Sequence, residues 1–354
     1  MTPSVFLRVI DGRLFLWNYV SHEQFEIDFD HLRRLMQLSG GDAPGQGEVD
    51  SDLRAAGCIQ DVDPDTWGWD CLSRIFHVGT QIGLRKDEAL PDGDAYRGYI
   101  EYCASLTASI PELNIERAGD TIALPSAKLS SLGDTPLWTA LHDRQTCRSF
   151  DAEPLPLEEV ATALWATFGT VHGECRADLE ALGMMPIGYR RTSPSGGSLH
   201  PSEAYLVAMR IKGLDPGIYH YRSHKHELSV VNAGFDTTSL GKLLCAQTFA
   251  NELSYGIFVT SRFDKMWWKY PHSRAYRVAL LDIGCLVQTF QLVCTARGIQ
   301  SWPTGYFIDH EVNRLLDLDS SRESAMFFLG AGKGSGTVSR EALETLRAMR
   351  TETP

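Results

Sequence analysis

The most restrictive feature of this sequence is a run of about 25 residues, Ser273 to Arg297, whose apolar side chains recur at helical spacing. They cover more than one face of the predicted helix and comprise Tyr276, Ala279, Leu280, Ile283, Leu286, Val287, Phe290 and Cys294. A helix that is apolar on more than one face has to be covered by other elements. With 354 residues, the chain is long enough to build a domain around it.

The segments around this helix alternate between helical and extended patterns. Apolar spacing predicts an amphipathic helix over 157–168, closed by Gly169. Strands are predicted over 203–209, 217–231, 255–263, 298–302 and 324–330. Further helices are predicted over 240–250, over 310–316 and around Leu343 and Leu346. This mixture predicts an α+β fold.

The first 62 residues have the pattern of a separate module. Two strands flank the turn Asp11-Gly12, and two short helices follow, the second of which ends at Gly57. We expect a winged-helix-like module over 1–62, a connecting helical region over 63–134 and the main domain over 135–354. Because its first helix has only two arginines and an acidic loop follows, peptide docking or scaffolding fits this module better than DNA binding.

The net charge and the amino-terminal sequence indicate where in the cell the protein is located and which classes of partner it can bind. The formal net charge is −12, which disfavours a general binder of nucleic acid or of anionic membranes. The first residues lack the basic and apolar regions of a secretory signal. We therefore expect a cytoplasmic protein that binds neither nucleic acid nor membrane.

Three clusters of residues have the character of a binding or catalytic site. In the first, RQTCRSF, two guanidinium groups (Arg144 and Arg148) lie close to hydroxyl groups, which suits a phosphate. A pair of surface arginines bonded to local carboxylates is the alternative.

The second cluster is RRTSPSGGSLHP, residues 190–201. Its adjacent glycines allow close backbone approach to a flat ligand, and Ser193, Ser195 and the amide groups can donate hydrogen bonds to the polar edge of that ligand.

In the third cluster, Lys269 and Tyr270 are adjacent, ahead of Arg274 and Arg277 at the head of the long helix. A lysine and a phenol side by side can divide the roles of base and acid, and we expect Lys269 to be buried.

In this order and spacing, the clusters resemble the flavin-dependent nitroreductase superfamily, in its SagB-type or McbC-like azoline-dehydrogenase branch. RQTCRSF is similar to the family's Arg-x-Ser-x-Arg-Phe element, and RRTSPSGGSLHPSEAYLV to its flavin loop, R-x-x-P-S-G/A-G-x-x-H-P-x-E-x-Y. KYPHSRAYR resembles the branch's Lys-Tyr-Gly-x-Arg-x-Tyr-Arg segment. The resemblance spans about Pro136 to Gly334 and implies a nitroreductase-like fold in which a mixed sheet is flanked by helices.

The resemblance implies a role for each matching residue. Contacts to the phosphate and ribityl chain of FMN would come from Arg144, Thr146 and Arg148, with Lys333 as a further phosphate ligand by position. Contacts to the isoalloxazine ring would come from Ser193, Ser195, Gly196 and Gly197, with Thr304 and Gly305 near its N5 atom. The catalytic pair would be Lys269 and Tyr270.

The sequence departs from the family pattern at four places. Thr146 stands where serine is usual, and Pro271 where glycine is usual, with one extra residue before Arg274. Asp282 and Cys285 replace the usual Glu and His of the long helix. These differences leave the substrate and the strength of catalysis open.

The resemblance implies an FMN-dependent oxidoreductase that converts thiazoline or oxazoline rings of a ribosomally made peptide to azoles during natural-product biosynthesis. Its partners would be a precursor peptide and a cyclodehydratase, and the enzyme would be a homodimer. The alternatives are an NAD(P)H-dependent flavin reductase of nitro, enone or dehydroamino-acid groups, and a scaffold subunit that has lost its chemistry.

A metal site is a further alternative. His220, His224 and His226 lie near one another in the sequence, and the last two would share one face of a strand. Because no carboxylate or cysteine completes a recognisable ligand spacing, we expect surface or hairpin-tip histidines and no bound metal.

Overall fold

The computed structural model describes residues 5–59, 67–82, 92–106, 110–173, 178, 181–182 and 190–351. The chain forms two compact units. The first comprises Met1–Pro91 with His272–Arg274, and the second comprises Asp92–Pro271 with Ala275–Pro354. The predicted three-part division at residues 62 and 134 stays a prediction.

The first unit contains a three-stranded antiparallel sheet and short helices. Its elements are β1 (Val5–Ile10), β2 (Arg13–Asn18), β3 (Glu23–Ile27), α1 (Phe29–Ser39), α2 (Glu48–Ala55) and α3 (Cys71–Gly79). The predicted hairpin turn is confirmed: Asp11 and Gly12 both have positive φ angles, as a tight turn between twisted strands requires. Leu16, Leu35, Leu38 and Leu53 form its small core, while the winged-helix-like character stays a prediction.

The second unit is built on a seven-stranded sheet in the order β12-β13-β11-β7-β9-β10-β4. These strands are β4 (Thr121–Ala123), β7 (Ser202–Ala208), β9 (Gly217–Arg222), β10 (Glu227–Asn232), β11 (Tyr255–Arg262), β12 (Gln300–Thr304) and β13 (Glu323–Gly332). Two short pairs lie outside it: β5 (Ser149–Phe150) with β14 (Gly334–Gly336), and β6 (Leu155–Pro156) with β8 (Ile211–Lys212). The α+β class is confirmed, and every pairing within the large sheet is antiparallel rather than mixed.

The second unit also contains the helices α4 (Asp92–Ser105), α5 (Leu137–Asp143), α6 (Leu157–Phe168), α8 (Leu240–Leu243), α9 (Phe263–Lys269), α10 (Arg274–Ala296), α11 (Asp309–Leu315) and α12 (Arg340–Thr351). Of these, α6 and α10 pack on one face of the sheet and α8 and α11 on the other. The predicted helix over 157–168 matches α6 to the residue, and Gly169 closes it. The predicted helix over 240–250 is wrong beyond Leu243, because Cys245 and Ala246 adopt positive φ angles that interrupt it.

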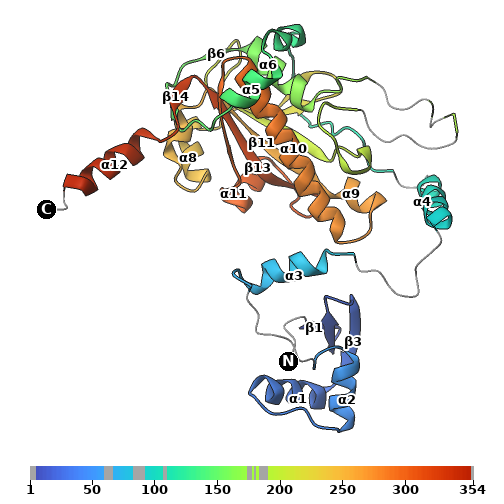
Figure 1. Cartoon of the computed structure of the whole chain (residues 1–354). Helices are drawn as coiled ribbons and strands as arrows, with labels where there is room; N and C mark the ends of the chain where they lie inside the picture. The colour runs from blue at the N-terminus through green and yellow to red at the C-terminus, as the bar shows by residue number, and fades with distance from the viewer. Residues whose placement is uncertain are drawn as a thin grey trace. The chain divides into compact units, whose positions relative to one another are not determined.

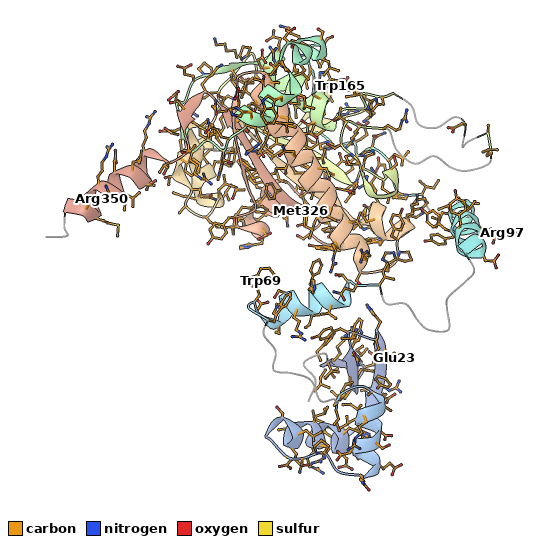
Figure 2. The ribbon with its side chains drawn as sticks, in the orientation of Figure 1. Glu23, Trp69, Arg97, Trp165, Met326 and Arg350 are labelled. Atoms are coloured by element: carbon orange, nitrogen blue, oxygen red, sulfur yellow. The ribbon has the colours of Figure 1, made fainter. Side chains whose placement is uncertain are left out.

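The predicted long helix is α10, which lies across β11 and β13 (Figure 1). Ile283, Leu286 and Phe290 of this helix pack with one face of the sheet in the larger hydrophobic cluster, against which Met326 also packs (Figure 2). Among the residues described, α10 alone has the length and composition of a membrane-spanning helix. Its packing against the sheet is that of a core helix.

The opposite face of the sheet has a core of its own. Tyr205, Phe258 and Phe328 of the sheet pack there against Leu244 and Val312. The sheet is therefore buried on both faces, and its strand ends and the loops that follow them are left to form a site.

Candidate active site

The predicted flavin loop is anchored on α10. The side chain of Ser193 is buried, and its Oγ lies 2.6 Å from Oγ1 of Thr289. This loop leads directly into β7, so the sheet and the long helix hold it from two sides.

Asp282 of α10 is the main anchor of the loop. Its carboxylate accepts hydrogen bonds from Ser195 Oγ at 2.6 Å and from the Gly196 amide at 3.1 Å. Ser195 Oγ in turn accepts a hydrogen bond from the amide of His200. Burial raises the pKa of Asp282 above its usual value. Asp282, which stands where the resembled family usually has glutamate, therefore supplies a carboxylate that holds the loop in place.

The loop backbone is held in an uncommon conformation. Gly197, Ser198 and His200 have φ angles of 60°, 59° and 45°. Left-handed conformations of non-glycine residues persist only where the surroundings impose them, and they concentrate at functional sites. A Cβ at Gly197 would clash with Tyr270 Oη, so the tyrosine also requires glycine there.

The predicted catalytic pair meets this loop. Lys269 is the last residue of α9, and its Nζ donates a 3.4 Å hydrogen bond to the carbonyl oxygen of Gly197. The same Nζ lies 5.6 Å from the ring centroid of Tyr270. The expected burial of Lys269 is wrong: the side chain is only partly buried, because it stands at the helix end. Lysine, phenol and flavin loop nevertheless converge.

The predicted phosphate-binding residues gather elsewhere, around β5, β12 and β14. Thr146 bridges to Ser301 of β12, and the Arg148 amide donates to the carbonyl oxygen of Gly336. Arg144 follows α5 directly. No carboxylate of the described residues forms an ion pair with Arg144 or Arg148, so the alternative of surface ion pairs finds no support there.

Lys333 follows the end of β13, and its carbonyl oxygen accepts from the Asp151 amide. Its side chain is exposed. The pKa of Glu159 is lowered mainly by its hydrogen bond with Arg297 and, to a smaller extent, by the charge of Lys333. The Lys333 ammonium therefore interacts electrostatically with the Glu159 carboxylate.

Thr304 ends β12 opposite Phe328, and its Oγ1 accepts a hydrogen bond from the Tyr306 amide. Gly305 is exposed beside it. Thr304 is the last residue of the edge strand β12, and Gly305 follows that strand directly.

The strand register places the two groups of predicted residues at opposite ends of the sheet. The flavin loop precedes Ser202 of β7, and α9 with Lys269 follows Arg262 of β11. The other ends of these strands, Ala208 and Tyr255, pair with each other next to Ala331, close to Lys333. At roughly 3.3 Å per residue, the two ends are about 20 Å apart. The predicted catalytic pair and the predicted phosphate-binding group of one chain are therefore separate.

Sequence reasoning missed a buried charged cluster behind the loop. Lys265, one turn before Lys269, is 3% exposed and donates to the carbonyl oxygens of Leu113 and His200. Burial lowers the pKa of Lys265 to about 8 and that of His200 to about 3. The only sequence signal is the H-P-x-E part of the loop motif, which contains His200 and Glu203.

The three histidines of the metal alternative have separate partners. His220 is buried against Glu203, His224 faces Glu116, and His226 contacts the Tyr221 hydroxyl. His224 and His226 lie in the turn between β9 and β10, so the expected hairpin-tip position is confirmed for these two and they share no strand face. For the buried His220 the expectation is wrong. Across the described ranges, no three His, Cys, Asp or Glu side chains gather as a metal site requires.

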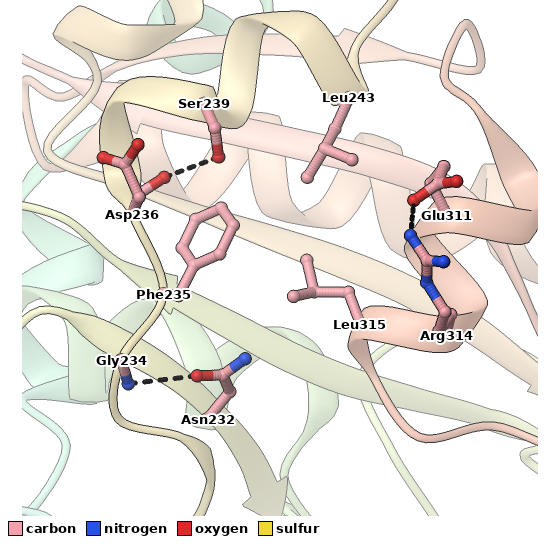
Figure 3. Close-up of a pocket in the computed structure, with 9 residues that line it drawn as sticks. All are labelled: Asn232, Gly234, Phe235, Asp236, Ser239, Leu243, Glu311, Arg314 and Leu315. Atoms are coloured by element: carbon pink, nitrogen blue, oxygen red, sulfur yellow. Dashed lines mark hydrogen bonds and ion pairs between the residues drawn. The ribbon is translucent and has the colours of Figure 1, made fainter.

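A pocket of about 440 Å³ lies on the other face of the sheet, between β10, α8 and α11 (Figure 3). Phe235, Leu243 and Leu315 form its apolar wall, and Glu311 forms an ion pair with Arg314 at its side. None of the predicted site residues lines this pocket, so it is distinct from the site described above.

Comparison with known proteins identifies relatives that process peptides. Over 143 residues, 39% of this chain, it is 31% identical to trifolitoxin-processing protein TfxB of Rhizobium leguminosarum bv. trifolii. Over 140 residues, 38% of this chain, it is 29% identical to microcin B17-processing protein McbC of Escherichia coli. The matches span 38% of TfxB and 51% of McbC, about half or less of each relative. They confirm the resemblance to the McbC-like branch.

The fold has a counterpart among solved structures. A protein described as a nitroreductase, from Anabaena variabilis, matches with a TM-score of 0.50 and 22% identity, over 70% of this chain and 48% of that one. The model of the nitroreductase family matches residues 141–333, a range that includes every predicted site residue from Arg144 to Lys333. Because this range is more than half of the chain, the protein belongs to the nitroreductase family.

Proposed function

We propose that this protein is an FMN-dependent oxidoreductase that converts thiazoline or oxazoline rings of a ribosomally made peptide to thiazoles or oxazoles. Membership of the nitroreductase family supports the redox class, and the names of TfxB and McbC support a peptide-processing role. The observation that most favours the proposal is the convergence of Lys269 and Tyr270 on Gly197 of the predicted flavin loop.

The residues present fit FMN. Arg144 and Arg148 form no ion pair with a described carboxylate, which suits binding of a phosphate. The anchored backbone at Gly196 and Gly197 offers a rigid, side-chain-free surface for a flat ring. When bound, FMN would supply the acceptor for the hydride that azoline oxidation removes, which no amino-acid side chain can be.

The protein residues then have two tasks, proton transfer and positioning. Oxidation of an azoline to an azole removes a hydride and a proton, and we assign the proton to Lys269, whose Nζ lies at the loop. Tyr270, with its hydroxyl against Gly197, would orient the ring or relay the proton. We propose oxygen as the final electron acceptor.

We further propose a homodimer in which each FMN lies between two chains. The predicted phosphate-binding group and catalytic pair of one chain stand at opposite ends of the sheet, so two chains related by a two-fold axis, with unlike ends facing each other, can complete two sites. The exposed apolar side chains of Leu280 and Leu281 on α10 supply a surface for the contact. A cyclodehydratase would deliver the precursor peptide, with the first unit as its docking module.

The first test is the absorption spectrum of the purified protein, with identification of any released chromophore. We expect about one FMN per chain and oxidation of a thiazoline peptide in the presence of oxygen. A colourless protein that takes up no added FMN would contradict the flavoenzyme proposal and favour the scaffold. Turnover of nitro or enone compounds with NAD(P)H, without azoline oxidation, would favour the reductase.

The base assignment is tested by Lys269→Ala, with Lys242→Ala, an exposed lysine on α8, as the matched control. We expect K269A to retain FMN but to lose azoline turnover by about a hundredfold or more, the usual effect of removing a general base. Full turnover by FMN-loaded K269A would overturn the assignment.

A further inference from the structure

The ammonium of Lys265 joins the predicted flavin loop to a distant segment of the chain. Lys265 lies in the first turn of α9, one helical turn before Lys269, and its side chain is 3% exposed. Its Nζ donates hydrogen bonds to the carbonyl oxygen of Leu113 at 2.9 Å and to that of His200 at 3.3 Å. One buried cation therefore holds the end of the loop and the segment that precedes β4.

His200 is a point at which the loop has to be held. It is a non-glycine residue with a φ angle of 45°, a conformation that persists only where the surroundings impose it. Its carbonyl oxygen accepts from Lys265, and its amide donates to Ser195 Oγ at 2.9 Å. Ser195 Oγ in turn donates to Asp282 of α10. The strained part of the loop is thus fixed at both ends, by Lys265 of α9 and by Asp282 of α10.

Packing alone does not require a lysine at this position. The apolar contact of α9 with the loop comes from the next residue, Met266, which packs with Leu199 and with Ala279 of α10. Burial of an ammonium has a large desolvation cost, whereas an apolar side chain of similar length fills the same space at less cost. What the ammonium of Lys265 adds is a pair of charge-assisted hydrogen bonds to backbone oxygens.

The surroundings of Lys265 leave it protonated at neutral pH. Glu203 of β7 and Asp264 of α9 favour the ammonium, while Arg191 and Arg262 oppose it. Burial is the largest influence and lowers the pKa of Lys265 to about 8, so the charged form predominates at pH 7. The cation is therefore present to bind both carbonyl oxygens.

We propose that Lys265 is a positioning residue, whose ammonium fixes the carbonyl group of His200 and thereby keeps residues 197–200 in the conformation that turnover requires. Within this stretch, Gly197 accepts a hydrogen bond from Lys269 and lies against Tyr270. Because its two hydrogen bonds go to backbone oxygens, Lys265 acts on the catalytic pair through the loop. The proposal rests on the proposed function, in which this loop binds FMN.

The test compares the wild type with Lys265→Met, which keeps most of the buried volume and removes both hydrogen bonds. Hydrogen exchange of the backbone amides of the purified full chain reports the hold on the loop. In K265M we expect the amides of residues 195–200 to exchange about tenfold faster, the equivalent of one hydrogen bond to a charged group, while those of β7 and β11 keep their wild-type rates. Wild-type exchange at 195–200 in K265M would overturn the proposal.

Turnover shows whether this hold matters for the chemistry. FMN-loaded K265M is expected to have about tenfold lower kcat for the azoline peptide with KM unchanged, because the substrate still binds but the catalytic pair is less often in place. Faster exchange together with wild-type kcat would overturn the positioning role.

Val312→Ala is the control for a general loss of stability. Val312 is fully buried in the core on the opposite face of the sheet, so V312A weakens the fold without altering the loop. It should keep wild-type exchange at 195–200 and wild-type kcat. Equal effects of V312A and K265M would assign the role of Lys265 to general stability and overturn the proposal.

Lys265→Gln is the test if K265M does not fold. The glutamine amide is neutral and one bond shorter than the lysine side chain, so it cannot hold both oxygens as the ammonium does. We expect about threefold faster exchange at 195–200 and a kcat lower by about the same factor, since a neutral hydrogen bond is weaker than a charged one. A folded K265Q with wild-type values would overturn the proposal.

Because the exchange measurement needs no turnover, it distinguishes failure of this proposal from failure of the proposed function. Faster exchange in K265M, in a protein that binds no FMN and oxidises no azoline, would reject the proposed function and keep the hold of Lys265 on the loop. Wild-type exchange in K265M would reject that hold even in an active enzyme.

Discussion

At the scale of single residues, the most unusual group is the ammonium of Lys265. It is almost fully buried, between the carbonyl oxygens of Leu113 and His200, with the carboxylate of Glu203 nearby. Burial opposes charge on Glu203, but its hydrogen bond with His220 and the charge of Lys265 keep its pKa at about 2. The loop that contains the site is thus backed by charged groups held inside the protein.

The stability of the protein should depend on pH through Lys265. Its pKa falls from 10.5 to about 8 on folding, so between these values the unfolded chain binds the proton and the folded protein does not. Stability contributed by this residue therefore rises with pH across that window. At about 1.36 kcal/mol per pKa unit, the rise is about 3 kcal/mol.

Urea unfolding of the wild type and of Lys265→Met at pH 7 to 10.5 measures this effect. As the pH rises, the free energy of unfolding of the wild type minus that of K265M should increase by about 3 kcal/mol. A difference that stays constant over the range would show that Lys265 keeps its ordinary proton affinity in the folded state.

At the scale of elements, the site depends on a strained loop tied to a rigid helix. Gly197 has a positive φ and lies directly against Tyr270, while Asp282 of α10 holds the residues just before it. The loop thus keeps its shape because α10, which is packed on the sheet, cannot move away.

Replacing Gly197 by alanine tests this arrangement. The new Cβ meets Tyr270 in addition to the backbone strain, so we expect a loss of stability of about 2–3 kcal/mol and at least a tenfold loss of turnover. Gly298→Ala is the matched control, because its φ of 64° is similar but nothing lies within 4 Å of its Cβ. The control should lose about 1 kcal/mol and keep its turnover. Equal effects on turnover would refute the role of the Tyr270 contact.

At the scale of the whole molecule, the proposed site needs two copies of the chain. Leu281 on α10 is 63% exposed, and Leu137 and Trp138 on α5 are also exposed. Large apolar side chains that are exposed on a folded domain, as these are on the second unit, are typical of surfaces that another protein covers.

Leu281→Asp places a charge on this surface and should convert a dimer to a monomer that retains little FMN. The oligomeric state can be measured by analytical ultracentrifugation, and the FMN content by absorption. Val9→Asp, at a comparably exposed position in the first unit, is expected to leave both unchanged. An L281D dimer with a full complement of FMN would contradict the two-chain site.

Local patterns in the sequence were sufficient for most elements and for the family. Apolar spacing and Gly169 predicted the bounds of α6, and the same periodicity predicted α10 as a core helix, because both signals lie within a few helical turns. The loop motif around Ser195 and the Lys269-Tyr270 pair predicted the nitroreductase resemblance, which the family match confirms.

The tertiary structure decided which residues meet. The sequence holds no local sign that Tyr102 contacts Lys269, or that Asp282 anchors the predicted flavin loop. It also gave no sign that the predicted phosphate-binding residues stand at the opposite end of the sheet from Lys269, because strand order and register set that separation. Short-range periodicity specifies elements, whereas contacts across long separations in the chain depend on how the packed sheet and helices arrange those elements.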